Sequence, residues 1–155
     1  TVADRKVAVA ALERAKETGS PAAAMELDDG RIITGKTSNL LGASAALLLN
    51  VLKELAGIDH ELHIISPQSI EPIQKLKVDY LKSRNPRLHT DEVLIALSAS
   101  AADNPQARLA LSQLPKLDGC QAHTSVMLSD VDIKIFTKLG VQLTSEAVYE
   151  HMILS

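Results

Sequence analysis

The segment at residues 40–56 constrains the fold most, because it reads as a helix that is apolar on nearly all sides. Its hydrophobic surface is interrupted only by Ser44, Asn50, Lys53 and Glu54. Other elements must therefore cover most of its circumference. Gly57 is placed to end the helix, and the run 37–39 (Thr-Ser-Asn) offers side-chain oxygens that cap a helix start. The sequence thus predicts a buried central helix.

A β-hairpin is predicted just before this helix. Residues 22–27 and 31–34 read as short strands. The turn between them contains Asp29 and Gly30, and Asp-Gly sequences tolerate the positive φ angles of tight hairpin turns. The chain is therefore expected to enter the central helix from a strand.

The remaining segments alternate between the two kinds of element. Helices are predicted at residues 4–18, 66–83, 93–101, 104–117 and 129–139, and strands at 61–65, 121–128 and 141–143. The run 93–101 is also compatible with a buried strand, but the acidic cap at residues 90–92 favours a helix. This order predicts an α/β fold with a three-layer α-β-α arrangement and a mixed sheet. A hairpin followed by a buried helix gives it a deaminase-like topology.

Length and composition are those of one α/β domain at residues 1–155. Cys120 is the only cysteine, which excludes an internal disulfide framework and leads us to expect a cytoplasmic location. The net charge is −3 and aromatic residues make up 2%, so no nucleic-acid partner is expected. No stretch without charge is long enough to cross a bilayer, so no membrane partner is expected either.

Residues 30–37 match the P-loop pattern G-x-x-x-x-G-K-[ST], but their context differs from that of a P-loop. Gly30 lies in the predicted hairpin turn, and Ile32 and Ile33 read as strand. Nucleotide hydrolysis is therefore disfavoured. A weaker hypothesis is an anion site at the strand-to-helix junction, where backbone N–H groups and a lysine would favour negative charge. The junction comprises Gly35, Lys36, Thr37 and Ser38. The alternative is that a hydroxyl there simply caps the helix.

Four other residues are candidate ligand contacts. They are Ser66 and Gln68 at a second strand-to-helix junction, Asn104 at a helix start, and His123 on a strand. If the strands before the two junctions are parallel neighbours, the junctions face each other across a crevice. Each candidate also has a plainer interpretation: Ser66 and Asn104 would cap helices that begin with proline, and His123 would make a surface hydrogen bond.

No metal or cofactor is expected, and no catalytic residue is assigned. A zinc deaminase needs His or Cys ligands and a Glu acid/base at these helix starts, and the two junctions offer neither a thiolate nor an imidazole. Near His60, only Glu61 and His63 would share a strand face, fewer than the three protein ligands of a catalytic zinc. Cys120 and His123 are three residues apart on a strand and therefore point to opposite faces, which disfavours a nucleophile pair.

Several blocks occur in an order that is typical of one bacterial family. They are Thr34-Gly35-Lys36-Thr37-Ser38, Leu48-Leu49-Asn50, Ile65-Ser66-Pro67, Ile70-Glu71-Pro72-Ile73, Leu94-Ile95-Ala96-Leu97-Ser98, Asn104-Pro105, Gly119-Cys120 with His123, and Leu139-Gly140-Val141-Gln142-Leu143-Thr144. The ordered set resembles the C-terminal part of the family called domain of unknown function 1846. The resemblance implies that the chain is the C-terminal domain of a longer protein, with that protein's N-terminal region as its partner. It carries over no catalytic residue.

Two functions follow from different features of the chain. The first is a binding domain for a small molecule or phosphate-bearing ligand, forming half of an active site that the N-terminal region completes. It leads us to expect Lys36 and Ser66 on one concave surface. The alternative is an interaction domain that assembles with the rest of the protein or forms a homo-oligomer, through an exposed apolar patch. Whether the chain is an enzyme stays open, because no complete set of nucleophile, base and orienting residue is visible.

Overall fold

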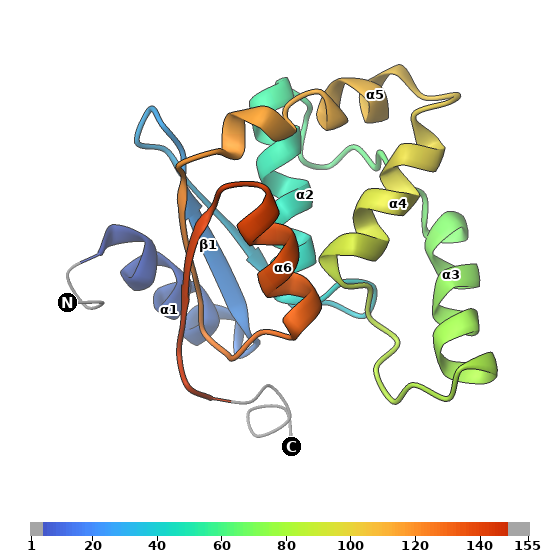
Figure 1. Cartoon of the computed structure of the whole chain (residues 1–155), viewed down its shortest axis with the longest axis horizontal. Coiled ribbons are helices and arrows are strands. Elements are labelled where there is room, and N and C mark those ends of the chain that lie inside the picture. The colour runs from blue at the N-terminus through green and yellow to red at the C-terminus, as the bar shows by residue number, and fades with distance from the viewer. Residues whose placement is uncertain (1–4, 149–155) are drawn as a thin grey trace.

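The computed structural model describes residues 5–148. Its elements are α1 (Lys6–Thr18), β1 (Ala22–Glu26), β2 (Ile32–Lys36), α2 (Ala43–Ala56), α3 (Pro67–Lys75), the π-helix η2 (Leu76–Tyr80), α4 (Thr90–Ser100), α5 (Pro105–Leu111), the 3-10 helix η3 (Leu114–Leu117), β3 (Gln121–Thr124), α6 (Asp130–Lys138) and β4 (Gln142–Ser145). Within these residues, six α-helices accompany one mixed sheet of four strands (Figure 1). The predicted α/β class and mixed sheet are confirmed.

The sheet has the strand order β2-β1-β3-β4. Strand β1 pairs antiparallel with both β2 and β3, and β3 pairs parallel with β4. The predicted hairpin is therefore confirmed as β1 and β2. Gly30 lies in its turn with φ 88°, a left-handed conformation that glycine adopts without strain.

Helices pack on both faces of β1, because successive side chains of a strand point to opposite sides. Ala24 packs with Val7 and Ala11 of α1. Ala23 and Met25 face the other way and join the larger core, which also contains the buried residues of α2, among them Leu47, Leu48, Val51 and Leu52. Figure 1 shows α1 on one side of the sheet and α2 and α6 on the other. The predicted burial of the central helix is confirmed.

The predicted start of this helix is wrong. Helix α2 begins at Ala43 after Gly42, not at residue 40, and residues 37–39 do not cap it. The backbone of residues 40–42 pairs instead with the segment before α4: Leu88 N donates to Leu40 O at 2.9 Å, and Gly42 N donates to Leu88 O at 3.2 Å. These tertiary hydrogen bonds hold residues 40–42 extended, so the helix begins after the predicted cap at residues 37–39.

The strand predicted at residues 61–65 is also wrong, because this segment is irregular. Lys53 on α2 reaches it and donates to the carbonyls of His60 and Leu62, each at 2.6 Å. Ile64 and Ile65 are buried in the core, which explains their strand-like sequence pattern. Because this strand is absent, the second predicted junction, at Ser66, does not follow a strand of the sheet.

The other predicted elements are present with shifted ends. Residues 93–100 are helical within α4 and Ala101 is its C-cap, so the strand alternative is wrong. The helix predicted at 66–83 is divided into α3 and η2, and the one predicted at 104–117 into α5 and η3. Strand β3 ends at Thr124, whose hydroxyl donates to the Val126 carbonyl at 2.7 Å and turns the chain into a loop. Asp4, the predicted first residue of the first helix, lies outside the described residues.

Between residues 5 and 148, no helix is both long enough and apolar enough to cross a bilayer.

Candidate functional site

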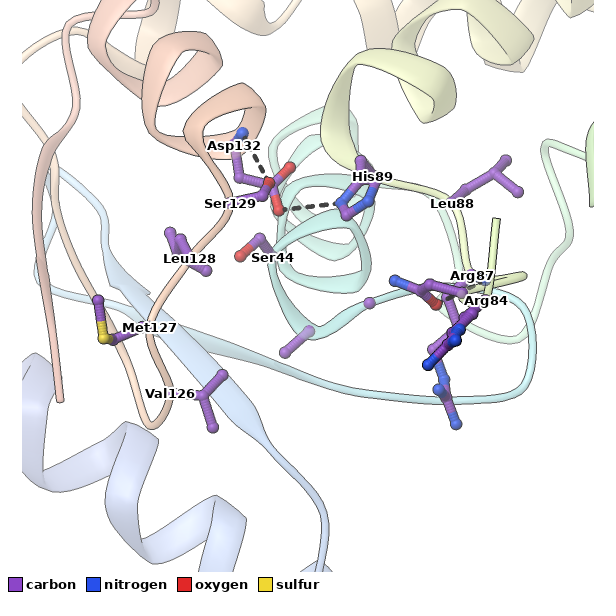
Figure 2. A pocket seen from close by; sticks show the side chains of 13 residues that line it. Ser44, Arg84, Arg87, Leu88, His89, Val126, Met127, Leu128, Ser129 and Asp132 are labelled. Carbon is purple, nitrogen blue, oxygen red and sulfur yellow. Dashed lines mark hydrogen bonds and ion pairs between the residues drawn. The ribbon is translucent and has the colours of Figure 1, made fainter. Parts of the chain in front are cut away.

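A pocket of about 530 Å³ lies where three α-helices begin. The N-cap residues of α2, α4 and α6 (Gly42, His89 and Ser129) all line it. The other lining residues are Ala43, Ser44, Arg84, Asn85, Arg87, Leu88, Val126, Met127, Leu128 and Asp132. Figure 2 shows the arginines at one side and Met127 with Leu128 at the other. The pocket therefore has a cationic side and an apolar side.

The start of α2 is open to an external acceptor. No side chain in the described part of the chain caps this helix, and its first turn contains no acidic residue. Ala43 and Ala45 are nevertheless buried, at 6% and 1% exposure. The first N–H groups of any α-helix lack partners within the helix and carry partial positive charge. A buried start without a cap is thus a place where an anion is stabilised.

The starts of α4 and α6 are satisfied by the protein itself. Glu92 Oε1 accepts from His89 N at 2.8 Å, and Ser129 Oγ accepts from Asp132 N at 3.3 Å. Both helices also carry acidic residues in their first turns. The three helix starts therefore differ, and α2 is the one left without a side-chain cap.

Ser44, in the first turn of α2, is a second unsatisfied group in the same place. Its side chain is 2% exposed, and its Oγ has no hydrogen-bond partner among the described residues. In Figure 2 this hydroxyl lies between Leu128 and the His89–Asp132 pair. A buried hydroxyl without a partner costs about 1–3 kcal/mol, so its retention next to a pocket points to a ligand atom as its partner.

Two arginines face the start of α2. Arg84 is exposed, and no hydrogen bond or ion pair involves its guanidinium within residues 5–148. Arg87 is half-buried, and its Nε donates to Ser38 O at 2.6 Å. The carbonyl of Arg87 accepts from the buried Lys77, which also pairs with Glu92 at 2.8 Å. Arg87 is therefore held in place, whereas Arg84 is free to bind a ligand.

His89 and Asp132 form a polar pair at the pocket, with His89 Nδ1 3.4 Å from Asp132 Oδ2. Asp132 Oδ1 accepts from Thr90 Oγ1 at 2.6 Å and from Thr90 N at 3.0 Å. The hydrogen bond with Asp132 raises the pKa of His89, although burial opposes this. Burial raises the pKa of Asp132, but the hydrogen bonds from His89 and Thr90 outweigh it, so this pKa lies below its usual value.

The apolar side of the pocket comes from the loop between β3 and α6. Val126 is buried, Leu128 is half-buried against the core, and Met127 is 41% exposed. The Met127 N–H donates to the Val148 carbonyl at 2.7 Å, which holds this loop against the end of the described chain. The loop therefore offers an ordered apolar wall.

The structure places the residues of the first predicted junction outside this pocket. Gly35 lies beneath α2, and a Cβ built on it would approach Leu47 N to 2.3 Å, so close packing explains the glycine. Lys36 is exposed at the end of β2, and the buried Thr37 donates its N–H to Pro21 O at 2.9 Å. Ser38 Oγ accepts from Leu40 N and Leu41 N and stabilises a turn. Ser38 contacts a pocket residue, because its carbonyl accepts from Arg87 Nε.

The other four predicted residues also lie outside the pocket lining. Ser66 caps α3 by accepting from Ser69 N, and Asn104 caps α5 by accepting from the N–H groups at residues 106 and 107. Gln68 is exposed on α3. His123 is fully buried, with Thr144 at 2.7 Å and Glu146 at 2.8 Å on its two ring nitrogens. Ligand binding by these residues stays a prediction.

Two other sequence observations concern reactive side chains. Cys120 is buried, and burial raises the pKa of its thiol, which makes it a poor nucleophile. Within residues 5–148, no three His, Cys, Asp or Glu side chains are grouped so that they could hold a metal ion.

The sequence gave little indication that the pocket residues would lie together. The cap signal at residues 90–92 and the helix predicted at 129–139 correctly indicated the starts of α4 and α6. Nothing in the sequence indicated that these starts meet Gly42, because the segments are far apart in the chain, and the start of α2 was also predicted three residues too early. Arg84 and Arg87 in the loop before α4 could have been noticed as cations close to a helix start.

Comparisons with known proteins give the context of this site. Residues 3–154 match the family described as "Domain of unknown function DUF1846, C-terminal". A UPF0371 protein of Corynebacterium efficiens is 62% identical over 154 residues, which cover 99% of this chain and 31% of that protein. A UPF0371 protein of Streptococcus uberis is 49% identical over 148 residues, covering 96% and 30%. The chain thus spans about a third of the length of these curated relatives.

Proposed function

The chain belongs to the DUF1846 C-terminal domain family, as its sequence resemblance predicted, and we propose that its pocket binds a phosphate group or a similar anion of a small molecule. The observation that carries this proposal is the buried, uncapped start of α2 beside Arg84 and Arg87. Backbone N–H groups at a helix start and arginine side chains are the two groups that proteins use most readily for phosphate.

The one carboxylate in the pocket does not cancel this attraction. Asp132 is 6% exposed, and its oxygens are engaged by His89 and Thr90. The raised pKa of His89 keeps more of this imidazole protonated near neutral pH, which offsets the charge of Asp132. With Arg84 and Arg87 the net charge of the pocket lining is therefore positive.

The test is binding of inorganic phosphate, measured by calorimetry at constant ionic strength. We expect Arg84→Gln to weaken binding about tenfold, the loss of one charge-assisted contact. Lys36→Gln is the matched control, because Lys36 is also an exposed cation but lies at the junction predicted from sequence. Weaker binding in Lys36→Gln alone would move the site to that junction, and no binding by the native chain would contradict the proposal.

The full-length relatives extend well beyond the matched region, so their N-terminal region is the natural partner of this domain. The proposal includes that this region completes an active site at the pocket and that the protein is cytoplasmic. Mixing this chain with the N-terminal region of the Corynebacterium efficiens relative tests the first part. Phosphate affinity should rise in the complex if residues from that region reach the pocket.

A second candidate function is assembly, and exposed apolar side chains favour it. Tyr80 and Leu81, at the end of η2, are 67% and 68% exposed, and Leu76 is 48% exposed. These residues lie in or just after η2, a few positions before Arg84 in the chain. Light scattering tests self-association: a monomer at all concentrations would leave the N-terminal region as the partner, and Leu81→Ser should weaken whichever complex forms.

We also propose that the fold is a three-layer α-β-α arrangement with deaminase-like topology. Its support is the packing of α1 and α2 against opposite faces of β1 and the strand order β2-β1-β3-β4. An experimental structure of the chain compared with solved deaminases would test it.

A further inference from the structure

We propose that the ligand is a phosphate monoester with an apolar body, whose phosphate lies at the start of α2 and whose body lies against residues 126–128. This inference rests on the proposed function and extends it to a chemical class of ligand. It follows from three observations: the size of the pocket, the separation of the two arginines from residues 126–128, and the exposure of Met127.

The pocket is larger than an inorganic anion requires. A water molecule occupies about 30 Å³ in the liquid, so an ion with five heavy atoms fills only a fraction of a 530 Å³ pocket. Pockets of this size bind organic ligands and are mostly apolar, with a few polar groups that fix the orientation. The space beyond the anion site is therefore room for an organic body.

The two arginines and residues 126–128 lie at opposite sides of the pocket, and Leu88 lies on the side of the arginines. The cationic side consists of Arg84, Arg87 and the start of α2, whereas Val126, Met127 and Leu128 form the opposite wall (Figure 2). Ser44 lies between the two sides in this view. A ligand that satisfies both sides must carry charge at one end and apolar surface at the other.

Met127 is the residue that an apolar body would cover. Met127 lines the pocket and is 41% exposed in all, whereas its neighbour Val126 is 3% exposed. Methionine side chains are flexible and polarisable and adapt to flat or irregular apolar ligands. The side chains of this wall offer no strong hydrogen-bond donor or acceptor, so a sugar-like body would lose hydrogen bonds to water without replacement. The wall therefore selects aryl or alkyl groups over polyols.

The experiment compares four probes by calorimetry with the 155-residue chain: inorganic phosphate, phenyl phosphate, glycerol phosphate and phenol. We expect phenyl phosphate to bind at least about tenfold more tightly than inorganic phosphate, through the apolar area it buries. Glycerol phosphate should bind no more tightly than inorganic phosphate. Phenol should bind most weakly, because it lacks the anion.

Two variants test whether residues 126–128 cause the tighter binding of phenyl phosphate. Met127→Ser should reduce the advantage of phenyl phosphate severalfold and leave the affinity for inorganic phosphate unchanged. Ile95→Ser is the matched control, because Ile95 is 66% exposed on α4 and does not line the pocket. It should leave all affinities unchanged.

The outcomes separate this inference from the proposed function. Equal affinities for inorganic phosphate, glycerol phosphate and phenyl phosphate would overturn the apolar body and leave phosphate binding intact. If Met127→Ser still binds phenyl phosphate more tightly than inorganic phosphate by the same factor as the native chain, the ring binds elsewhere, and this result would also overturn the inference. Absence of binding by every phosphate probe would instead contradict the proposed function itself.

Discussion

The Nδ1 atom of His89 lies 3.4 Å from Oδ2 of Asp132, and this contact joins the starts of α4 and α6 across 43 positions of sequence. Thr90 donates two hydrogen bonds to the other oxygen of the same carboxylate. Asp132 thereby acts as a shared acceptor for two residues at the start of α4. The pair forms one border of the pocket and holds two of its three helix starts together.

This pair should make stability depend on pH. Because the pKa of His89 is raised in the folded protein, this residue stabilises the fold. Its contribution to the unfolding free energy is fully present below pH 6.5, the pKa in the unfolded chain, and is lost as pH rises through the folded pKa. Because the pKa of Asp132 is lowered in the folded protein, its contribution to the unfolding free energy is present above pH 3.8, the pKa in the unfolded chain. It is lost as pH falls through the folded pKa. The difference in unfolding free energy between the native chain and His89→Gln should therefore be largest between these values, on the order of 1 kcal/mol. Urea unfolding across pH measures it.

The matched control for this pH series is His63→Gln, because His63 is exposed and has no hydrogen bond among the described residues. That variant should follow the native profile at every pH. A constant offset of His89→Gln at all pH values would show that the imidazole acts through packing alone.

Ser44→Ala should separate stability from binding. Removing the unpartnered hydroxyl should leave the free protein equally stable or up to about 1 kcal/mol more stable, because no hydrogen bond is lost. The same variant should bind inorganic phosphate more weakly. The control is Ser125→Ala, since Ser125 Oγ accepts from Ala22 N at 2.9 Å and its loss leaves that N–H unsatisfied. Thermal unfolding with and without phosphate measures both effects, and a destabilised Ser44→Ala would refute the idea.

Gly35→Ala should destabilise the fold strongly. The added methyl would lie 2.3 Å from Leu47 N and 2.6 Å from Leu47 Cα, so α2 would have to move away from β2. We expect a loss of about 3 kcal/mol or more in denaturant unfolding. Gly57→Ala is a useful comparison, because Gly57 has φ 70° but open space around it, and only the left-handed backbone should cost about 1–2 kcal/mol. Similar losses in the two variants would mean that packing at Gly35 is not tight.

Asn104→Ala and Ser66→Ala test whether two sequence-predicted ligand residues act only as helix caps. Each side chain accepts a hydrogen bond at the start of its helix, so each variant should lose about 1 kcal/mol of stability. Phosphate affinity should remain that of the native chain. A clear loss of affinity in either variant would support the ligand contacts predicted from sequence.

Local patterns succeeded wherever the determining contacts are local. The hairpin turn at Gly30 and the caps at Ser66 and Asn104 each involve residues a few positions apart, so the pattern and the structure agree. The apolar surface of α2 likewise predicted its burial. These features follow from backbone conformation and hydrophobic periodicity, which short segments express on their own.

The two wrong assignments have a common cause. Residues 37–39 carry a good cap signal, yet Leu88 holds the following residues extended. Residues 61–65 look like a strand, yet the Lys53 ammonium binds the carbonyl of Leu62 and that of the preceding His60. In both places a group outside the segment, Leu88 in one and Lys53 in the other, forms hydrogen bonds with it that the local pattern does not indicate.

The alternation of strands and helices around a buried central helix was predictable from the chain alone, because burial patterns, turns and caps are properties of short segments. The position at which α2 begins, and the meeting of its start with those of α4 and α6 in one pocket, depend on tertiary contacts. The reason is physical: contacts such as His89–Asp132 and Gly42–Leu88 join segments far apart in the chain, and no local pattern records which segments will meet.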